Sequence, residues 1–230
     1  MYTENAFESG IAAASARSEF IRKTYLNLAL AFVAFIGVEA LLMSWQPAVE
    51  FAARMVNGGN WLIVLLAFMG VSWLANSWAL SAASLGKQYA GLYLYVVAEA
   101  VIFLPLLLVA ESYAPDTIPQ AAILTAALSG GITAYVFITK KDFSYLGTFL
   151  VIGSFVALGL IVCAVLFGFS LGLWFSAAMV VFAGIAVLYQ TSAVLHQYQN
   201  SQYVAAALGL FAAIALMFWY ILQILMGSRR

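Results

Sequence analysis

The chain has 230 residues, of which 66% are hydrophobic and only 8% are charged. A soluble domain carries roughly 25% charged residues, so this composition excludes an ordinary soluble domain and indicates an integral membrane protein. Nine basic and nine acidic residues cancel, and this balance gives no reason to expect nucleic-acid binding. The one cysteine, Cys163, lies in an apolar run and cannot form an internal disulfide.

The sequence consists of a polar N-terminal tail followed by apolar runs. Residues 1–23 are polar and of mixed charge, and we expect a cytoplasmic N-terminal tail there, followed by a membrane domain at 24–230. A membrane-spanning helix needs about 20 apolar residues. Seven runs meet this length: Thr24–Trp45, Trp61–Ala83, Tyr89–Ala110, Ile118–Thr139, Ser144–Phe169, Leu171–Leu195 and Tyr203–Gly227. They are continuous rather than alternating, which favours helices over a barrel. We therefore predict an all-α integral membrane protein with seven transmembrane helices.

Short connections join these runs, and Ala48–Met55 in the first connection is expected to form an interfacial turn. Lysine and arginine set the orientation of a membrane protein. With the N-terminus inside, six basic residues lie inside and three outside. The inside set is Arg17, Arg22, Lys23, Lys87, Lys140 and Lys141, and the outside set is Arg54, Arg229 and Arg230. This bias predicts a multi-pass protein of the cell inner (plasma) membrane, in the lipid bilayer, with a cytoplasmic N-terminus, although the final arginine pair opposes it.

Two carboxylates fall inside the predicted spans. Glu99 is central in the third run, and Glu39 is nearer the outer end of the first. An acid in the bilayer interior is costly and is a functional candidate by default. For Glu99 we favour function over a protonated acid that only bonds a neighbouring helix, and we expect it to point into the bundle toward the sixth or seventh span, with no second membrane acid near it. Glu39 is expected to reach water.

Polar residues also gather in the sixth run, in the stretch AGIAVLYQTSAVLHQY. Tyr189, Ser192 and His196 share one helical stripe, while Gln190 lies on a neighbouring stripe beside Thr191. The functional interpretation is a site for an ion. The alternatives are that Gln190 bridges two helices and that the tyrosine and histidine anchor the helix end at the interface.

Motifs of soluble enzymes are missing: the sequence has no glycine-rich phosphate loop, no HExxH and no Cys/His metal cluster. We predict no enzyme activity, no cofactor, no catalytic residue and no resident metal site. Ser192, His196 and Glu99 are the residue types of a Ser–His–acid catalytic set, but nothing in the sequence indicates that they act together. Calcium needs about six to eight oxygens, so a site made of Glu99, Gln190, Thr191, Tyr95 and carbonyls would be weak and transient. The candidates for an ion path or pH sensing are thus Glu99, Gln190, Tyr95, Thr191 and His196.

Five stretches occur in a fixed order: RKTYLNLALAF, YAGLYLYVVAEAVIFLPLL, TKKDFSYLGTFL, AVLYQTSAVLHQY and AALGLFAAIALMFWYILQILMG. Together they resemble the transmembrane Bax inhibitor motif family, Bax inhibitor one-like, in its bacterial branch, from about Arg22 to Gly227. The resemblance implies seven helices, six of them around a central one. It also implies a carboxylate pair, one acid in each of the last two helices, that shares a proton and gates a pH-sensitive calcium leak. In some members an arginine near the second helix latches this pair.

The sequence departs from that pattern where the family has its acids. The sixth-helix acid position holds Gln190, the matching seventh-helix position is aligned with Ala213, and no arginine occurs between Arg54 and Arg229. The acid pair is therefore degenerate, with Glu99 as the nearest substitute. Two functions stay open. One is a channel-like leak for calcium or another cation, and the other is a non-enzymatic modulator of an FtsH-type membrane protease, as some bacterial relatives resemble.

Overall fold

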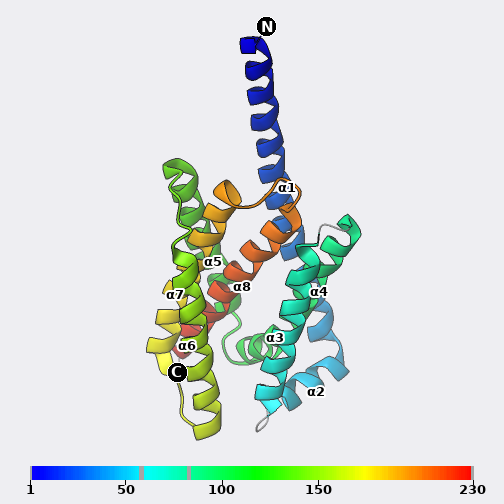
Figure 1. The fold of residues 1–230 in the computed structure, drawn as a ribbon. Coiled ribbons are helices and arrows are strands. Elements are labelled where there is room, and N and C mark those ends of the chain that lie inside the picture. The colour runs from blue at the N-terminus through cyan, green and yellow to red at the C-terminus, as the bar shows by residue number, and fades with distance from the viewer. Residues whose placement is uncertain (1, 57–59, 82–83, 229–230) are drawn as a thin grey trace.

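The computed structural model describes residues 2–56, 60–81 and 84–228, with side chains from residue 14 onward. Eight helices form this part of the chain, and none of it forms a strand (Figure 1). They are α1 Tyr2–Ser44, α2 Gln46–Met55, α3 Asn60–Ala79, α4 Leu85–Tyr113, α5 Thr117–Thr139, α6 Leu146–Phe167, α7 Gly172–His196 and α8 Tyr203–Gly227. Seven of the described helices, all but α2, are long and apolar enough to cross a membrane. The prediction of an all-α membrane protein with seven spans is confirmed.

Between the first two spans lies helix α2, at the position where an interfacial turn is expected from the sequence. Pro47 lies at its start, where a missing backbone N–H costs no helical hydrogen bond. Its buried face carries Ala48 and Ala52, which pack against Leu104 of α4. Helix α2 therefore lies across the end of the bundle and continues the packing of α4.

Helix α1 is one continuous helix that includes the segment expected to be the tail. Its apolar span covers Ala14–Ser44, and the part before it projects beyond the other helices in Figure 1. Half-buried Arg17 fastens α1 to the end of α7: its guanidinium donates to the carbonyl oxygens of Val194 and Tyr198 and to the side chain of Asn200. Cations stabilise the exposed carbonyls of a helix C-terminus, so this contact joins the first and sixth spans at the N-terminal end of the bundle.

Helix α8 lies at the centre of the bundle. It packs against α1, α3, α4, α5 and α7, and 67% of its apolar window is buried, whereas none of the window of α6 is. This agrees with the central helix that the family resemblance implies. Small residues on one stripe of α8, Ala206, Gly209 and Ala213, allow its neighbours to approach closely. Helix α6 lies outermost and packs mainly on α7.

A second close approach joins α3 to α4 at Gly91. A methyl group added there would collide with the backbone of Ala75 and Ala79 on α3, both fully buried. Because backbone cannot move aside, only glycine fits this position. The two helices thus form a tight pair on one flank of α8.

The outer surfaces of the spans are strongly apolar. Large side chains there point away from the bundle, such as Phe155 of α6 with 71% of its surface exposed and Trp73 of α3 with 75%. A contiguous apolar exterior of this kind indicates contact with lipid, since soluble monomers rarely expose large apolar patches. The protein is therefore embedded in a bilayer.

Candidate functional site

Two carboxyl groups are buried where α1 packs against α4. Glu39 of α1 is 5% exposed and Glu99 of α4 is 6% exposed. Neither oxygen of Glu39 has a hydrogen-bond partner, and Oε2 of Glu99 has none either. The two groups lie close enough for their charges to repel one another. Buried carboxyls without partners are costly, so their retention points to a functional role.

The expectation that Glu39 reaches water is wrong, as is the expectation that Glu99 has no acid near it. Helix α1 runs along α4 with its Glu39 side turned inward, and the rings of Phe35 and Phe103 meet edge to face at 5.3 Å beside the two acids. The stripe that carries Glu39 is therefore covered by α4 rather than by solvent. Sequence spacing could not reveal this, because it does not tell which face of α1 another helix covers.

Glu99 does point into the bundle, but no hydrogen bond from the sixth or seventh span reaches it among the described residues. Its near polar neighbour on α4 is the hydroxyl of Tyr95, one turn earlier and within hydrogen-bonding reach. The ring of Tyr95 packs against Phe68 of α3 at 5.9 Å and against Phe211 of α8 at 6.1 Å, measured between centroids. These rings close the space between Glu99 and the N-terminal end of the bundle.

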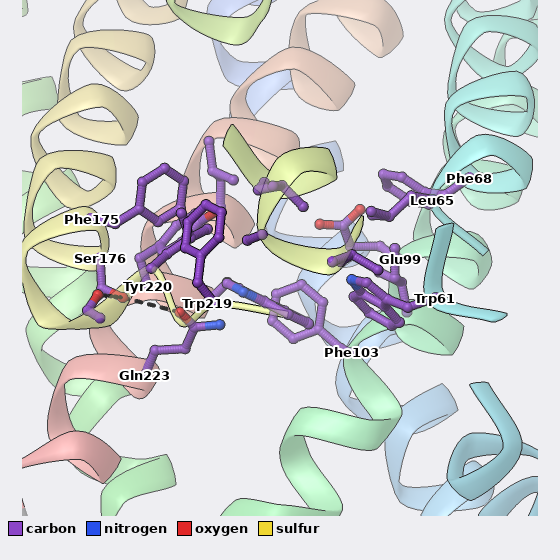
Figure 2. A pocket seen from close by; sticks show the side chains of 18 residues that line it. Trp61, Leu65, Phe68, Glu99, Phe103, Phe175, Ser176, Trp219, Tyr220 and Gln223 are labelled. Atoms are coloured by element: carbon purple, nitrogen blue, oxygen red, sulfur yellow. Dashed lines mark hydrogen bonds between the residues drawn. The ribbon is translucent and has the colours of Figure 1, made fainter. Parts of the chain in front are cut away.

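Toward the opposite end of the bundle, Glu99 lines a cavity of about 570 Å³. Figure 2 shows Glu99 at one end of this cavity and the hydrogen-bonded pair Ser176 and Gln223 at the other. The hydroxyl of Ser176 on α7 donates to Oε1 of Gln223 on α8 at 3.1 Å. A second cavity of about 710 Å³ adjoins the same pair and continues to Ala114 and Gly227. The two cavities share Gly172, Ser176 and Gln223 as lining residues, and together they are called the hollow.

Gln190 lies on the other side of α8 from this hollow. Its side chain packs on Gly209, and its carbonyl accepts a hydrogen bond from the hydroxyl of Tyr198 at 3.3 Å. Residues 209 and 211 of a helix point about 200° apart, so Gln190 and the Tyr95 ring contact opposite faces of α8. Ala213, one turn after Gly209, is buried in one core cluster with Ala183 and Val187 of α7. The structure brings Glu99 and Tyr95 together but separates both from Gln190.

Thr191 belongs to a third polar group, near the N-terminal end. It is fully buried, and its hydroxyl lies near those of Tyr25 on α1 and Thr133 on α5. The hydroxyls of Tyr25 and Thr191 form no hydrogen bond of good geometry. This cluster joins three helices through polar contacts, as hydroxyl groups commonly do between membrane helices.

His196 is exposed at the end of α7, with Nδ1 at 3.1 Å from the carbonyl oxygen of Ser192. The hydroxyl of Ser192 accepts a hydrogen bond from the backbone of Phe143 at 2.8 Å and therefore holds the α5–α6 connection. In that connection the backbone N–H of Ser144 donates to Asp142 at 2.9 Å, and this hydrogen bond lowers the pKa of the Asp142 carboxyl. Ser192 thus positions a loop, and the hypothetical set with Glu99 does not form.

The structure also does not bring together the side chains of the weak calcium site that the sequence suggested. Its four side chains are divided between the two sides of α8, and none of the described residues forms a group of three or more His, Cys, Asp or Glu side chains able to hold a metal ion. Sequence reasoning also missed Ser176 and Gln223. A polar residue within an apolar run, the signal that identified Glu99, was present at Gln223 in YILQILMG.

The sequence profile of a family described as "Inhibitor of apoptosis-promoting Bax1" matches residues 17–230. The chain belongs to the Bax inhibitor family. An uncharacterized protein of Pseudomonas aeruginosa is 32% identical over 90% of this chain and 88% of its own length. The Golgi anti-apoptotic protein of Vaccinia virus (strain Lister) is 28% identical over 99% of this chain and 94% of its own. Protein lifeguard 4 of Mus musculus is 28% identical, with coverage of 96% and 92%. The family is thus matched along nearly the whole membrane domain.

Proposed function

We propose that this Bax inhibitor family member is a cation leak protein in which Glu39 and Glu99 form the pH-sensing pair. The observation that carries the proposal is the burial of both carboxyls, largely without hydrogen bonds, with Glu99 lining the hollow and Glu39 beside it on α1. Carboxyl oxygens attract cations, and calcium is the cation that the family resemblance suggests first. Another cation would use the same groups.

The proposed path begins at the end of the bundle opposite the N-terminus. It passes through the larger cavity, crosses the Ser176–Gln223 hydrogen bond and reaches Glu99 through the smaller cavity. Beyond Glu99 the packed rings of Tyr95 and Phe211 close it. The described conformation is therefore a closed state, which opens when these rings separate.

The pair supplies the pH dependence. Two interacting carboxyls lose their protons as a coupled pair, so their charge state changes in two steps. When both are ionised, they repel each other across the α1–α4 interface and attract a cation between them. In the family, an acid pair on the last two helices performs this role. In this chain, the acids on the first and third spans would perform it, in place of the degenerate positions Gln190 and Ala213.

The test is calcium flux into liposomes that contain the purified protein, measured over a pH series. The parent is expected to show pH-dependent flux, and the double variant Glu39→Gln, Glu99→Gln to show flux that no longer varies with pH. Glu111→Gln is the matched control, because Glu111 is an exposed acid on the same helix as Glu99. A double variant with the pH profile of the parent would refute the pair as the sensor.

The location that suits this function is the inner (plasma) membrane, with the N-terminus in the cytoplasm. The excess of lysine and arginine at that end of the bundle supports the orientation. In Figure 1 the N-terminus lies at the same end as the start of α4, whose first turn contains Lys87, and the end of α5, which Lys140 follows. The hollow below Glu99 would then open to the outside.

One observation supports a second candidate, the modulator of an FtsH-type protease: the first turns of α1 project past the bundle, where a cytoplasmic enzyme could bind them (Figure 1). The test is to delete residues 2–13 and follow how fast the protease degrades a membrane substrate in cells. A changed rate with unaltered flux in liposomes would favour this candidate. An unchanged rate would remove it.

A further inference from the structure

The cavity beside Glu99 has the features of a binding site for an organic molecule. At about 570 Å³ it falls within the range of small-molecule sites. Its walls come from α3, α4, α6, α7 and α8, and its lining is mostly apolar. Most of the side chains that line it are apolar or aromatic, with Glu99 at one end and the Ser176–Gln223 pair at the other. The middle of the cavity is therefore suited to the apolar part of an organic molecule.

The lining of the cavity, as far as the structure describes it, carries negative charge and no positive charge. Among the described residues that line it, Glu99 is the one charged side chain, and no lysine or arginine contributes. Its Oε2 is buried and has no hydrogen-bond partner. A buried carboxylate without a partner favours a cationic group beside it, because a nearby positive charge compensates for its lost hydration. The ligand is thus expected to carry a positive charge at the Glu99 end.

Aromatic rings form the wall next to the acid. The indoles of Trp61 and Trp219 are stacked at 6.4 Å, and the ring of Phe103 meets Trp219 edge to face at 4.8 Å. Figure 2 shows Phe103 and Trp219 between Glu99 and the Ser176–Gln223 pair, and Trp61 on the Glu99 side. Aromatic faces attract cations and pack well against other rings. This combination selects a cation surrounded by apolar groups over a small hydrated ion.

We propose that the cavity binds a lipophilic organic cation, with its charge beside Glu99 and its apolar groups against Trp61, Phe103 and Trp219. The helices α3 and α6, which contribute opposite walls, touch each other only lightly. A ligand dissolved in the bilayer can therefore enter between them. This inference goes beyond the proposed leak, since it requires binding and no flux.

The test is a titration of the purified full-length protein with tetraphenylphosphonium, followed by quenching of tryptophan fluorescence. Tetraphenylborate has nearly the same size and shape with the opposite charge and serves as the matched probe. We expect saturable quenching by the phosphonium and none by the borate. The variant Glu99→Gln should weaken phosphonium binding about tenfold or more, which corresponds to losing one buried charge interaction. Glu111→Gln should bind like the parent.

A second variant covers the case in which Glu99→Gln does not fold. Ala164→Phe places a ring in the cavity from α6 without changing any charge, and it should abolish binding while Glu99 is intact. Equal binding of both probes, or phosphonium binding that survives either variant, would show simple partitioning into apolar surface and overturn the proposal, as would no binding by the parent. Binding without calcium flux would instead contradict only the proposed leak.

Discussion

Glu39 and Glu99 lie on neighbouring helices inside the bundle, close enough to repel each other, and three of their four carboxyl oxygens are buried without a hydrogen-bond partner. An arrangement of this kind lowers stability, since each buried polar group without a partner costs about 1–3 kcal/mol. Proteins retain such costs at sites where activity requires them. The predictions below follow from this pair and from the packing around it.

Removal of the acid at Glu39 should stabilise the protein and impair its activity. In Glu39→Met an apolar side chain of similar length replaces two unpartnered oxygens, so the free energy of unfolding should rise by about 1–3 kcal/mol. Thermal unfolding in detergent measures this change. The exposed Glu50 provides the control variant Glu50→Met, which should leave the unfolding temperature nearly unchanged. A lower unfolding temperature for Glu39→Met would contradict the prediction.

Substitution of Phe211 should open the closed end of the hollow. Phe211 is fully buried and contacts the rings of Tyr95 and Phe32. Phe211→Leu shortens this barrier, and we expect higher calcium flux at a pH where the parent conducts little. The same change at Phe155, which points outward from α6, should have no effect. Equal flux in the two variants would place the barrier elsewhere.

Two glycines should respond differently to the same methyl group. Gly91→Ala meets the backbone of Ala75 and Ala79, which cannot yield, and should cost about 1–3 kcal/mol of stability. Gly209→Ala meets the end of the Gln190 side chain, 2.6 Å from Oε1, which can rotate away. Its cost should stay near the value of the lost Tyr198 hydrogen bond, about 1 kcal/mol. Chemical or thermal unfolding of both variants would measure the contrast, and the reverse order would disprove it.

Arg17 should matter more for stability than Lys23, although both are basic residues of α1. Arg17→Ala removes hydrogen bonds to Val194 and Tyr198 and leaves carbonyls of α7 without a donor, for an expected loss of about 1–2 kcal/mol. Lys23 forms an exposed ion pair with Glu19, and such pairs contribute little. Equal losses of unfolding temperature in Arg17→Ala and Lys23→Ala would show that the Arg17 contact is unimportant.

The orientation is open to a labelling experiment. In a Cys163→Ala background, cysteines at Lys87 and Lys140 should react with a membrane-impermeant maleimide from the same side of the membrane, and a cysteine at Arg54 from the other side. The number of spans between these positions requires this result. Labelling of Lys87 and Lys140 from opposite sides would refute the seven-span topology.

The sequence by itself determined that the chain spans a membrane, how many times it does so and nearly where each span lies. Runs of apolar residues carry this information, because the thickness of the bilayer sets the length of each helix. The sequence also identified Glu99 as a candidate, because an acid within an apolar run is costly whichever way its helix faces. The family could be recognised because its motifs are local stretches of sequence that occur in a fixed order, and such stretches can be identified without the tertiary structure.

Only the tertiary structure decided which polar groups meet. Helices α1 and α4 are separated in sequence by two other helices, and the facing of Glu39 toward Glu99 depends on how α1 rotates and packs, which no local pattern encodes. The same holds for Gln190, which appeared to be a partner of Glu99 but lies across α8 from it. Packing of side chains around α8 sets these rotations, and so the acid pair and its cavity exist only in the folded bundle.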